Sequence, residues 1–236
     1  MKLPTCIYHL AEAANWPSIQ RDGLQSARRL MRAAGLPRAE QNRLERTQRL
    51  THTILPTGVH IRDQHPMPPA ALDRCLCGMN SSDWYATINA RVFFWIDPDR
   101  LNRQKAACES RPQVVFVVDT AALIAAHEQC IAVTPINTGN ARRKAARRGA
   151  ATFVPLLTWM RSGWESEAAA LGVPLRRASQ QPVELTVLDS VADIMRFVIE
   201  VFPLQPGQPF IERYSVSTLS HMDSSTARCP RFPYMQ

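Results

Sequence analysis

The stretch from Ile7 to Leu24, I-Y-H-L-A-E-A-A-N-W-P-S-I-Q-R-D-G-L, organises the interpretation of the whole chain. Its opening is a short apolar run around one histidine, His9, which predicts a buried strand too short to span a membrane. Asn15 stands where it would cap a following helix, and Gly23 stands where that helix would end in the left-handed conformation. The stretch therefore predicts a strand, a loop, a short helix and a glycine stop.

His9 in this strand has two interpretations. A lone histidine in an apolar strand is commonly a core residue whose ring forms hydrogen bonds within the protein. Alternatively, it lies beside a helix N-terminus, where backbone N–H groups and the helix dipole favour anionic ligands such as phosphates. These residues alone leave both interpretations open.

Length and composition predict one large domain of mixed α and β structure. The chain has 236 residues, of which 45% are hydrophobic, and this is enough to bury a full core. Its net charge of +8 suits a partner that carries phosphates, although charge identifies no particular substrate. We assign residues 1–202 to the domain and residues 203–236 to a Pro-rich C-terminal extension.

The cysteines and histidines indicate no metal site. The six cysteines have no repeated C-x-x-C spacing, so we expect reduced thiols instead of a zinc site or a disulfide framework. The prolines from Pro56 to Pro69, around His60 and His65, predict an irregular loop at 56–69, to which we assign no metal. No window approaches the ~20 apolar residues of a spanning helix, so we expect a soluble, cytoplasmic protein.

A second informative stretch is R-V-F-F-W-I at 91–96, followed by D-P-D-R. Its β-branched and aromatic residues predict a buried strand. Arg91 and Arg100 flank this strand, and each either extends its charged end to the surface or faces a ligand.

A third informative stretch is Q-P-V-E-L-T-V at 181–187, whose alternation predicts another strand. Glu184 should project to the face opposite Val183 and Leu185. A carboxylate in this position is either exposed to solvent or fixed in a functional site.

The densest basic run is A-R-R-K-A-A-R-R-G at 141–149, and it follows a turn rich in Asn and Gly. We consider two interpretations, a solvated helix and a surface that faces phosphates or nucleic acid. The residues concerned are Arg142, Arg143, Lys144, Arg147 and Arg148.

The rest of the chain alternates between helical and extended patterns. Two helices broken near residues 35–37 are predicted within 26–50, and further helices are predicted at 101–112, 120–127 and 158–171. Asp119 or Thr120 should cap the helix at 120–127. Strands are predicted at 113–119, 130–134 and 151–156, and residues 195–202 fit either a helix or a strand.

Three of these stretches resemble ADP-ribosyltransferases, most closely the DarT-type toxins that modify DNA. The opening Y-H-x-x-x-x-x-N-W-P-S-I-x-x-x-G-L, the strand before Arg100 and the run E-L-x-V-x-x-x-V-x-x-I from Glu184 resemble family motifs and occur in family order. Two positions differ. Ala11 stands where the family usually has threonine, and Asp99 stands where it has an arginine, so that Arg100 lies one position later.

The resemblance implies an α+β fold with a split mixed β-sheet, helices outside it and NAD in the cleft between the sheet halves. It implies that NAD is a substrate bound by His9, Leu10, Asn15, Ile19 and Gly23. It further implies that Glu184, with Arg91 or Arg100, serves catalysis without a metal. Transfer of ADP-ribose to a nucleic acid, DNA or RNA, is the implied reaction, in a toxin that an antitoxin protein would control.

Two other functions stay open on this sequence. RNA 2′-phosphotransferases share the histidine-bearing opening and use NAD to accept a phosphate. Ala11 and the displaced arginine instead suit a catalytically silent module that binds NAD or nucleic acid. The acceptor depends on loops that vary within a fold, so the sequence does not identify it.

Overall fold

The computed structural model describes residues 2–108, 110–142 and 145–211. The strands are β1 (Cys6–Glu12), β2 (Leu24–Gln25), β3 (Thr53–Ile54), β4 (His60–Ile61), β5 (Arg91–Trp95), β6 (Gln113–Asp119), β7 (Ile131–Thr134), β8 (Val154–Pro155), β9 (Glu184–Leu188), β10 (Ser190–Val191) and β11 (Val198–Leu204). The α-helices are α1 (Trp16–Asp22), α2 (Ala27–Ala33), α3 (Arg38–Arg46), α4 (Pro69–Asp73), α5 (Ser81–Asn89), α6 (Pro98–Ala106), α7 (Thr120–His127), α8 (Leu156–Ser162) and α9 (Glu165–Leu171).

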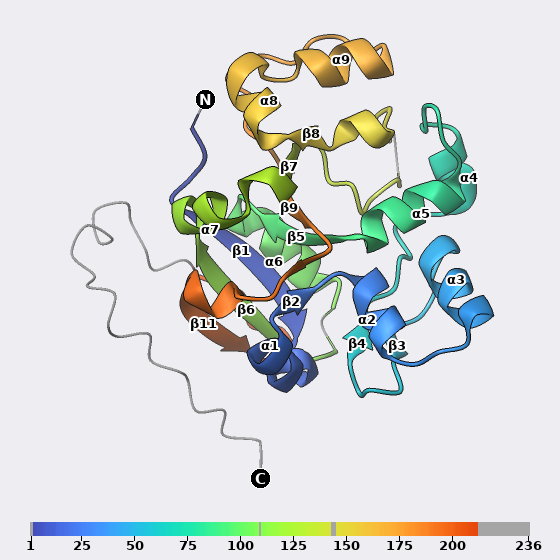
Figure 1. Ribbon diagram of the computed structural model, residues 1–236, viewed down its shortest axis with the longest axis vertical. Coiled ribbons are helices and arrows are strands. Elements are labelled where there is room, and N and C mark those ends of the chain that lie inside the picture. Colours follow the sequence, from blue (N-terminus) through green and yellow to red (C-terminus); the bar gives the residue numbers. More distant parts are fainter. Residues whose placement is uncertain (1, 109, 143–144, 212–236) are drawn as a thin grey trace.

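A seven-stranded sheet in the order β11-β6-β1-β5-β9-β7-β8 forms the centre, and helices lie around it (Figure 1). β1 pairs with β6 along its whole length, but it meets β5 in a single residue pair, Tyr8 with Trp95. The sheet is therefore split into two halves that separate from this pair. This confirms the predicted α+β fold with a split sheet.

Every pairing between strands of this sheet is antiparallel in the described residues, so the prediction of a mixed sheet is wrong in this detail. Strand direction depends on the long connections between strands, because only a crossover connection allows neighbours to run parallel. Local alternation of apolar and polar residues does not contain that information.

The core of the protein is built around β6, the strand that the apolar run at 113–119 predicts. In β6 the residues from Val114 to Val118 have no solvent exposure, because β1 and β11 flank the strand and apolar clusters cover both faces of the sheet. Asp119 ends β6 and accepts a hydrogen bond from the backbone N–H of Ala122, so it caps α7 as predicted.

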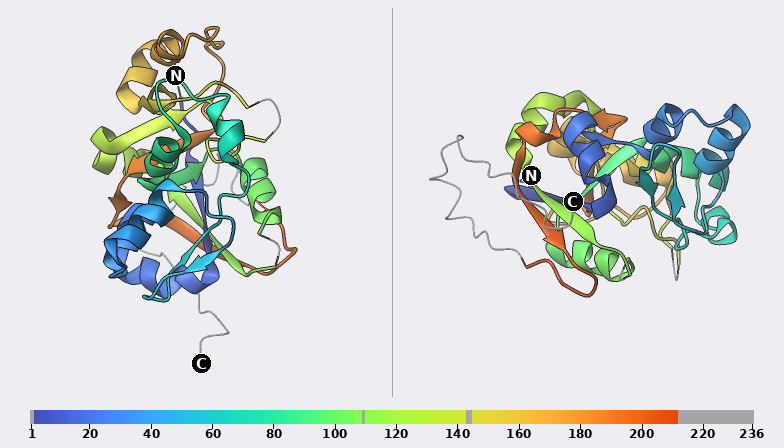
Figure 2. Two further views of the ribbon diagram at one scale, coloured as in Figure 1. Left: turned by 90° about the vertical axis from the view of Figure 1, so that its right-hand side faces the viewer. Right: turned by 90° about the horizontal axis from the view of Figure 1, so that it is seen from below.

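A lobe beside the sheet contains α2 to α5 and the hairpin of β3 and β4 (Figure 2). Met31, Leu44 and Ile61 are among the residues of its own apolar cluster. The break between α2 and α3 is confirmed. The predicted irregular loop at 56–69 is wrong at its start, because β4 pairs with β3 through a turn at Gly58.

The C-terminal part of the sheet extends past the predicted domain end at residue 202. Residues 195–202 are extended in their second half, where β11 pairs with β6 as far as Leu204. Phe210 is buried against Tyr8, with ring centroids 5.5 Å apart, and its backbone exchanges two hydrogen bonds with the side chain of Asn102. Residues 212–236 of the predicted extension lie outside the described residues.

Gly23 ends α1 at a position that requires glycine. Its φ is 74°, and a Cβ atom there would lie 2.4 Å from the carbonyl oxygen of Ala192. Strain from the backbone conformation alone should reduce the free energy of unfolding of Gly23→Ala by about 1–3 kcal/mol, and the contact should reduce it further.

Gly35 offers a matched control for this substitution, because its φ is 68° but a Cβ atom there has nothing within 4 Å. Urea unfolding should therefore give a larger loss for Gly23→Ala than for Gly35→Ala. Equal losses would mean that the chain accommodates a Cβ beside Ala192 at no cost.

Candidate functional site

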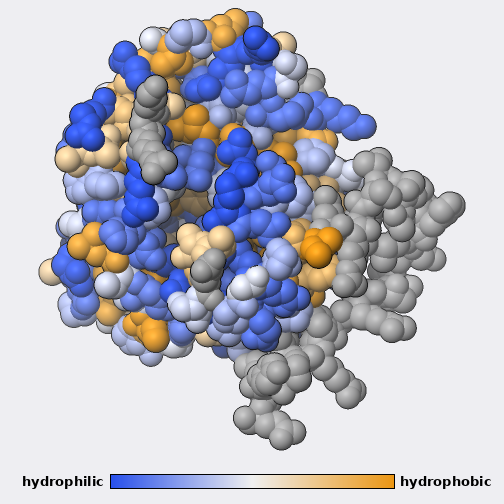
Figure 3. Space-filling view, turned by 180° about the vertical axis from the view of Figure 1, so that it is seen from behind, coloured by the Kyte–Doolittle hydropathy of each residue, from blue (hydrophilic) through white to orange (hydrophobic). Residues whose placement is uncertain are grey.

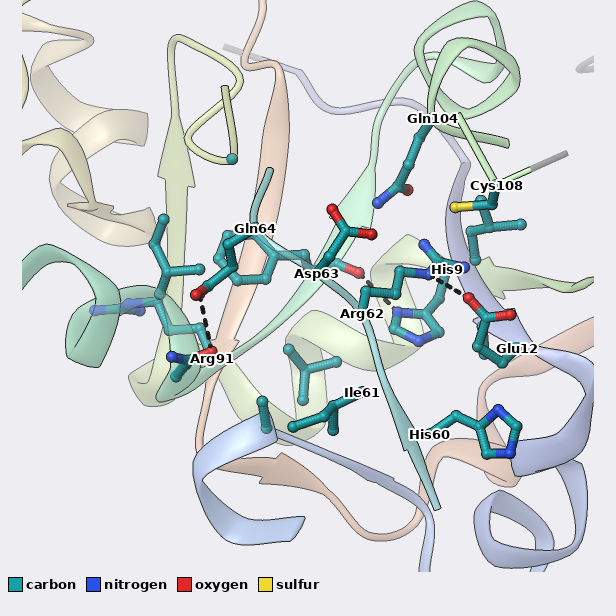
Figure 4. Close-up of a pocket in the computed structure, with 18 of the residues that line it drawn as sticks. His9, Glu12, His60, Ile61, Arg62, Asp63, Gln64, Arg91, Gln104 and Cys108 are labelled. Atoms are coloured by element: carbon teal, nitrogen blue, oxygen red, sulfur yellow. Dashed lines mark hydrogen bonds and ion pairs between the residues drawn. The ribbon is translucent and has the colours of Figure 1, made fainter. Parts of the chain in front are cut away.

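A cavity of about 660 Å³ is lined by residues from both halves of the split sheet. β1 contributes His9 from one half, and β5 and β9 contribute Arg91 and Glu184 from the other. Figure 4 shows His9 near Arg62 on one side of the cavity and Arg91 across from them. A cavity of this size lies within the range of small-molecule sites.

The side chain of His9 on β1 forms a hydrogen bond to β5 in the other half of the sheet. Its Nδ1 lies 2.8 Å from the carbonyl oxygen of Phe93 on β5. Because a carbonyl only accepts hydrogen bonds, Nδ1 carries the hydrogen and Nε2 is left as an acceptor. Burial lowers the pKa of His9 to about 4. The bond to Phe93 raises this pKa, and the charge of Arg62 lowers it further. His9 is therefore neutral near pH 7, and it is both bonded within the fold and part of the cavity.

Glu184 is not the solvent-exposed carboxylate of the alternative interpretation, because it is only 4% exposed. It begins β9, between Trp95 of β5 and Thr134 of β7. Its Oε2 accepts hydrogen bonds of 2.9 Å from the hydroxyls of Thr134 and Thr138. The backbone N–H of Thr138 lies 3.3 Å from both carboxylate oxygens.

Burial raises the pKa of Glu184 to about 7, although the bonds from Thr138 and Thr134 and the charge of Arg148 act against it. A carboxyl group that titrates near neutrality in a cavity is typical of an acid or base in a functional site. The geometry thus gives one group that can exchange a proton and become negatively charged near pH 7.

Arg91 lines the cavity and has no carboxylate partner in the described part of the chain. Its Nη1 donates to the hydroxyl of Thr186 over 3.3 Å, its guanidinium lies 4.4 Å from the ring centroid of Phe153, and its Nε is buried without a partner. Burial, with help from the charge of Arg28, lowers the pKa of Arg91 to about 10. A partly buried cation of this kind suits an anionic ligand.

Arg100 also lines the cavity but has a different environment. It lies in the first turn of α6, its side chain is 38% exposed, and its Nε is 3.6 Å from the carboxylate of Asp97. Of the two predicted catalytic arginines, Arg91 is therefore the more buried and the one without a carboxylate partner.

Sequence analysis missed a second charged group at the cavity, centred on Glu12. This carboxylate is 3% exposed and accepts hydrogen bonds from Arg62 at 3.0 Å, Arg111 at 3.1 Å and Gln113 at 2.6 Å. Burial would raise the pKa of Glu12, but the charge of Arg62 and the bonds from Arg111, Arg62 and Gln113 lower it below its usual value. A carboxylate in an apolar strand was the available signal, because such a group needs partners.

Asn15 has a different role from the predicted helix cap. Its side chain forms no capping bond, and instead its Nδ2 donates to the carbonyl of His60 at 2.8 Å while its Oδ1 accepts from the backbone N–H of His60 at 2.7 Å. The amide thus holds β4 beside the cavity. The other residues predicted to bind NAD, which are Leu10, Ile19 and Gly23, line the cavity, as do Ala11 and Asn15.

The basic run at 141–149 is not a solvated helix in the part that the structure describes, and not all of its residues lie at the surface. Its described residues form no helix, and Arg142 and Arg147 are exposed. Arg143 and Lys144 lie outside the described residues. The prediction that Arg148 faces nucleic acid is wrong, because Arg148 is 2% exposed and its guanidinium is bonded to backbone carbonyls.

No group of three or more His, Cys, Asp or Glu side chains in residues 2–108, 110–142 and 145–211 could hold a metal ion. None of the helices found in these ranges is long and apolar enough to cross a membrane.

The chain belongs to the family of unknown function DUF7002, whose family model matches residues 5–198. Comparison with curated proteins gives no match. The solved structures similar to it include Thermosipho africanus DarTG in complex with ADP-ribose, at 11% identity and a TM-score of 0.40, where the match covers 84% of this chain and 43% of that chain. The chain thus spans less than half the length of that protein.

Two structures of Thermus sp. 2.9 DarT are also similar to the chain. One is in complex with ADP-ribosylated ssDNA, at 13% identity and a TM-score of 0.38. The other is in complex with NAD+, at 14% identity and a TM-score of 0.38. Each match covers 85% of this chain and 83% of the other chain.

Proposed function

We propose that this DUF7002 protein is an NAD-dependent ADP-ribosyltransferase that transfers ADP-ribose from NAD to a nucleic acid. The observation that carries the proposal is that His9 and Glu184, from opposite halves of a split sheet, line one cavity. The three sequence motifs that resemble DarT-type enzymes contain these two residues and support the same reaction. By the same resemblance, we propose a cytoplasmic toxin whose partner is an antitoxin protein.

The residues around the cavity fit NAD as a substrate. The cavity has room for a ligand of this class, Nε2 of His9 can accept a hydrogen bond from a ribose hydroxyl, and Arg62, Arg91 and Arg100 supply positive charge for phosphates. We assign to Glu184 the stabilisation of positive charge on the ribose as nicotinamide leaves, since a fixed charge in a buried site is most effective there. Asn15 contributes by holding β4 at the cavity.

Transfer of label from NAD tests the proposal. The protein is incubated with NAD labelled in the adenine ring, together with single-stranded DNA, RNA, RNA carrying a 2′-phosphate, or protein, and the products are analysed by mass spectrometry. We expect ADP-ribose on DNA or RNA. NAD-dependent loss of the 2′-phosphate would identify an RNA 2′-phosphotransferase instead, and binding without any product would identify a silent module.

NAD should protect the protein thermally, and His9→Ala should remove most of this protection. A ligand that binds only the folded state adds about 2.7 kcal/mol at a concentration of 100 Kd. His65→Ala is the matched control, because His65 is exposed and outside the cavity lining. If His9→Ala responds to NAD as the parent and His65→Ala do, the cavity is not the NAD site.

Nucleic-acid binding should be weak and sensitive to salt, because each neutralised phosphate releases counterions. Replacing Arg142 and Arg147 by Gln should flatten the slope of log affinity against log salt by about 0.7 for each lost contact with single-stranded DNA. Hydrophilic side chains cover much of the face seen in Figure 3, with hydrophobic ones between them. Exposed arginines outside the basic run provide controls. Replacing Arg161 and Arg196, which are also exposed, should change the slope less. Equal slopes for both pairs would remove Arg142 and Arg147 from the interface.

A further inference from the structure

Arg148 is a buried cation whose charge is satisfied by the backbone. Its Nη1 donates to the carbonyl oxygens of Thr138 at 3.2 Å and Asn140 at 3.0 Å, and its Nε donates to the carbonyl of Ala146 at 3.1 Å. No carboxylate lies within ion-pair distance of it in the described residues. Burial lowers the pKa of Arg148, and the Cys75 thiol and then the charge of Glu184 act against this effect. Since burying a charge is costly, this arrangement requires a reason.

Arg148 is anchored to a segment that lies far away in the sequence. Its backbone N–H donates to the carbonyl of Cys75 at 2.9 Å, and its carbonyl accepts from the N–H of Cys77 at 2.8 Å. Its guanidinium lies 5.7 Å from the ring centroid of Trp84, which is fully buried in α5. The segment that contains Cys75 and Cys77, together with Trp84, therefore helps to fix the position of Arg148.

Thr138 connects Arg148 to Glu184. Its carbonyl accepts from Arg148, while its N–H and its hydroxyl both donate to the Glu184 carboxylate. Thr138 is fully buried, and the residues beside it in the loop, Asn137 and Gly139, line the cavity with it. A shift of this loop would therefore move two of the donors that orient the Glu184 carboxylate.

We propose that Arg148 is a positioning residue for Glu184: Arg148 fixes the loop at Thr138, so that the donors of Thr138 orient the Glu184 carboxylate. The positive charge of Arg148 also favours the ionised form of this carboxylate. Its importance for transfer rests on the proposed function, whereas its effect on the titration of Glu184 does not. The role is different from a nucleic-acid contact, since Arg148 is 2% exposed and contacts the cavity lining only from behind, through the backbone of Thr138 and Asn140.

The groups that act on Glu184 define the titration experiment. Thr134 and Thr138 donate hydrogen bonds to it, and Arg148 is the charged group whose effect on it is resolved. Arg148 in turn lies against the Cys75 thiol. The other titratable or charged side chains that line the same cavity are His9, Glu12, Arg49, His60, Arg62, Asp63, Arg91, Arg100, Arg103 and Cys108.

Thermal unfolding as a function of pH tests the coupling without any activity. The proteins compared are the parent, Arg148→Gln and the control Arg161→Gln, which removes an exposed positive charge, each with and without Glu184→Gln. The difference in Tm between a protein and its Glu184→Gln counterpart follows the titration of Glu184 alone. We expect Arg148→Gln to move this titration upward by about one pH unit, because an adjacent opposite charge is lost, and Arg161→Gln to leave it in place.

An unchanged titration in Arg148→Gln would overturn the inference. If Arg148→Gln does not fold, Arg148→Lys is used in its place. The titration of Glu184 should then shift upward by less, because lysine keeps the charge but cannot bond the carbonyls of Thr138 and Asn140 in the same geometry. No shift in Arg148→Lys would then overturn the inference.

Transfer activity provides the second readout. Arg148→Lys should reduce kcat by about 10²-fold, the effect of a small misplacement of a reacting group, and leave KM for NAD nearly unchanged. Unchanged kcat would overturn the positioning role. If the parent transfers nothing, the proposed function fails while the titration result still decides whether Arg148 acts on Glu184.

Discussion

Glu184→Gln should keep the fold and the affinity for NAD but release nicotinamide roughly 10²- to 10³-fold more slowly than the parent, which is the cost of losing one preorganised electrostatic group. The substitution preserves size and can still accept hydrogen bonds from Thr134 and Thr138, so the loop around it should stay in place. What it removes is the negative charge that would stabilise the positively charged ribose. Single-turnover nicotinamide release measures this step directly.

A matched control for this experiment is Glu165→Gln, which removes a carboxylate from an exposed position on α9. It should release nicotinamide at the parent rate. If Glu184→Gln also matches the parent rate, Glu184 is a buried structural residue, and the transferase proposal loses its main chemical group.

The stability difference between the parent and Glu184→Gln should decrease as pH rises from about 4.5 to about 7. The pKa of Glu184 is raised in the folded state, so its stabilising contribution is fully present below the ordinary value of 4.5 and is lost as pH rises through about 7. At about 1.4 kcal/mol per pH unit, this range corresponds to a loss on the order of 3 kcal/mol.

The parent alone would hide this effect, because His9 acts in the opposite direction over nearly the same range. Its folded pKa is lowered from 6.5 to about 4, so its contribution is present above pH 6.5 and is lost as pH falls. In the parent, the contributions of Glu184 and His9 to the free energy of unfolding should therefore nearly cancel as pH rises. The free energy of unfolding should rise with pH in Glu184→Gln and fall with pH in His9→Ala. Urea unfolding across this range checks all three, and parallel profiles for the parent and Glu184→Gln would mean that Glu184 titrates normally.

The parts of the fold that sequence analysis predicted correctly depend on local patterns. The apolar run of β6 specifies a buried strand whatever its neighbours are, and Asp119 caps the next helix through a bond to a residue only three positions away. For the same reason, the break between α2 and α3 could be predicted from Gly35 and Pro37.

The parts that could not be predicted depend on segments far apart in the chain. Arg62 reaches Glu12 across 50 positions, and the amide of Asn15 is bonded to the backbone of His60 across 45. Arg148 belongs to a basic run that suggests a solvated surface, yet Cys75 and Trp84 bury it. Local composition cannot distinguish a buried arginine from an exposed one when distant residues decide its environment.

The most direct test of the account uses NAD labelled separately in its nicotinamide and adenine rings, mixed with the parent protein and single-stranded DNA or RNA. We expect the nicotinamide label to be released as a free small molecule and the adenine label to become part of the nucleic acid, in equal amounts. Recovery of both labels in intact NAD after prolonged incubation would contradict this expectation.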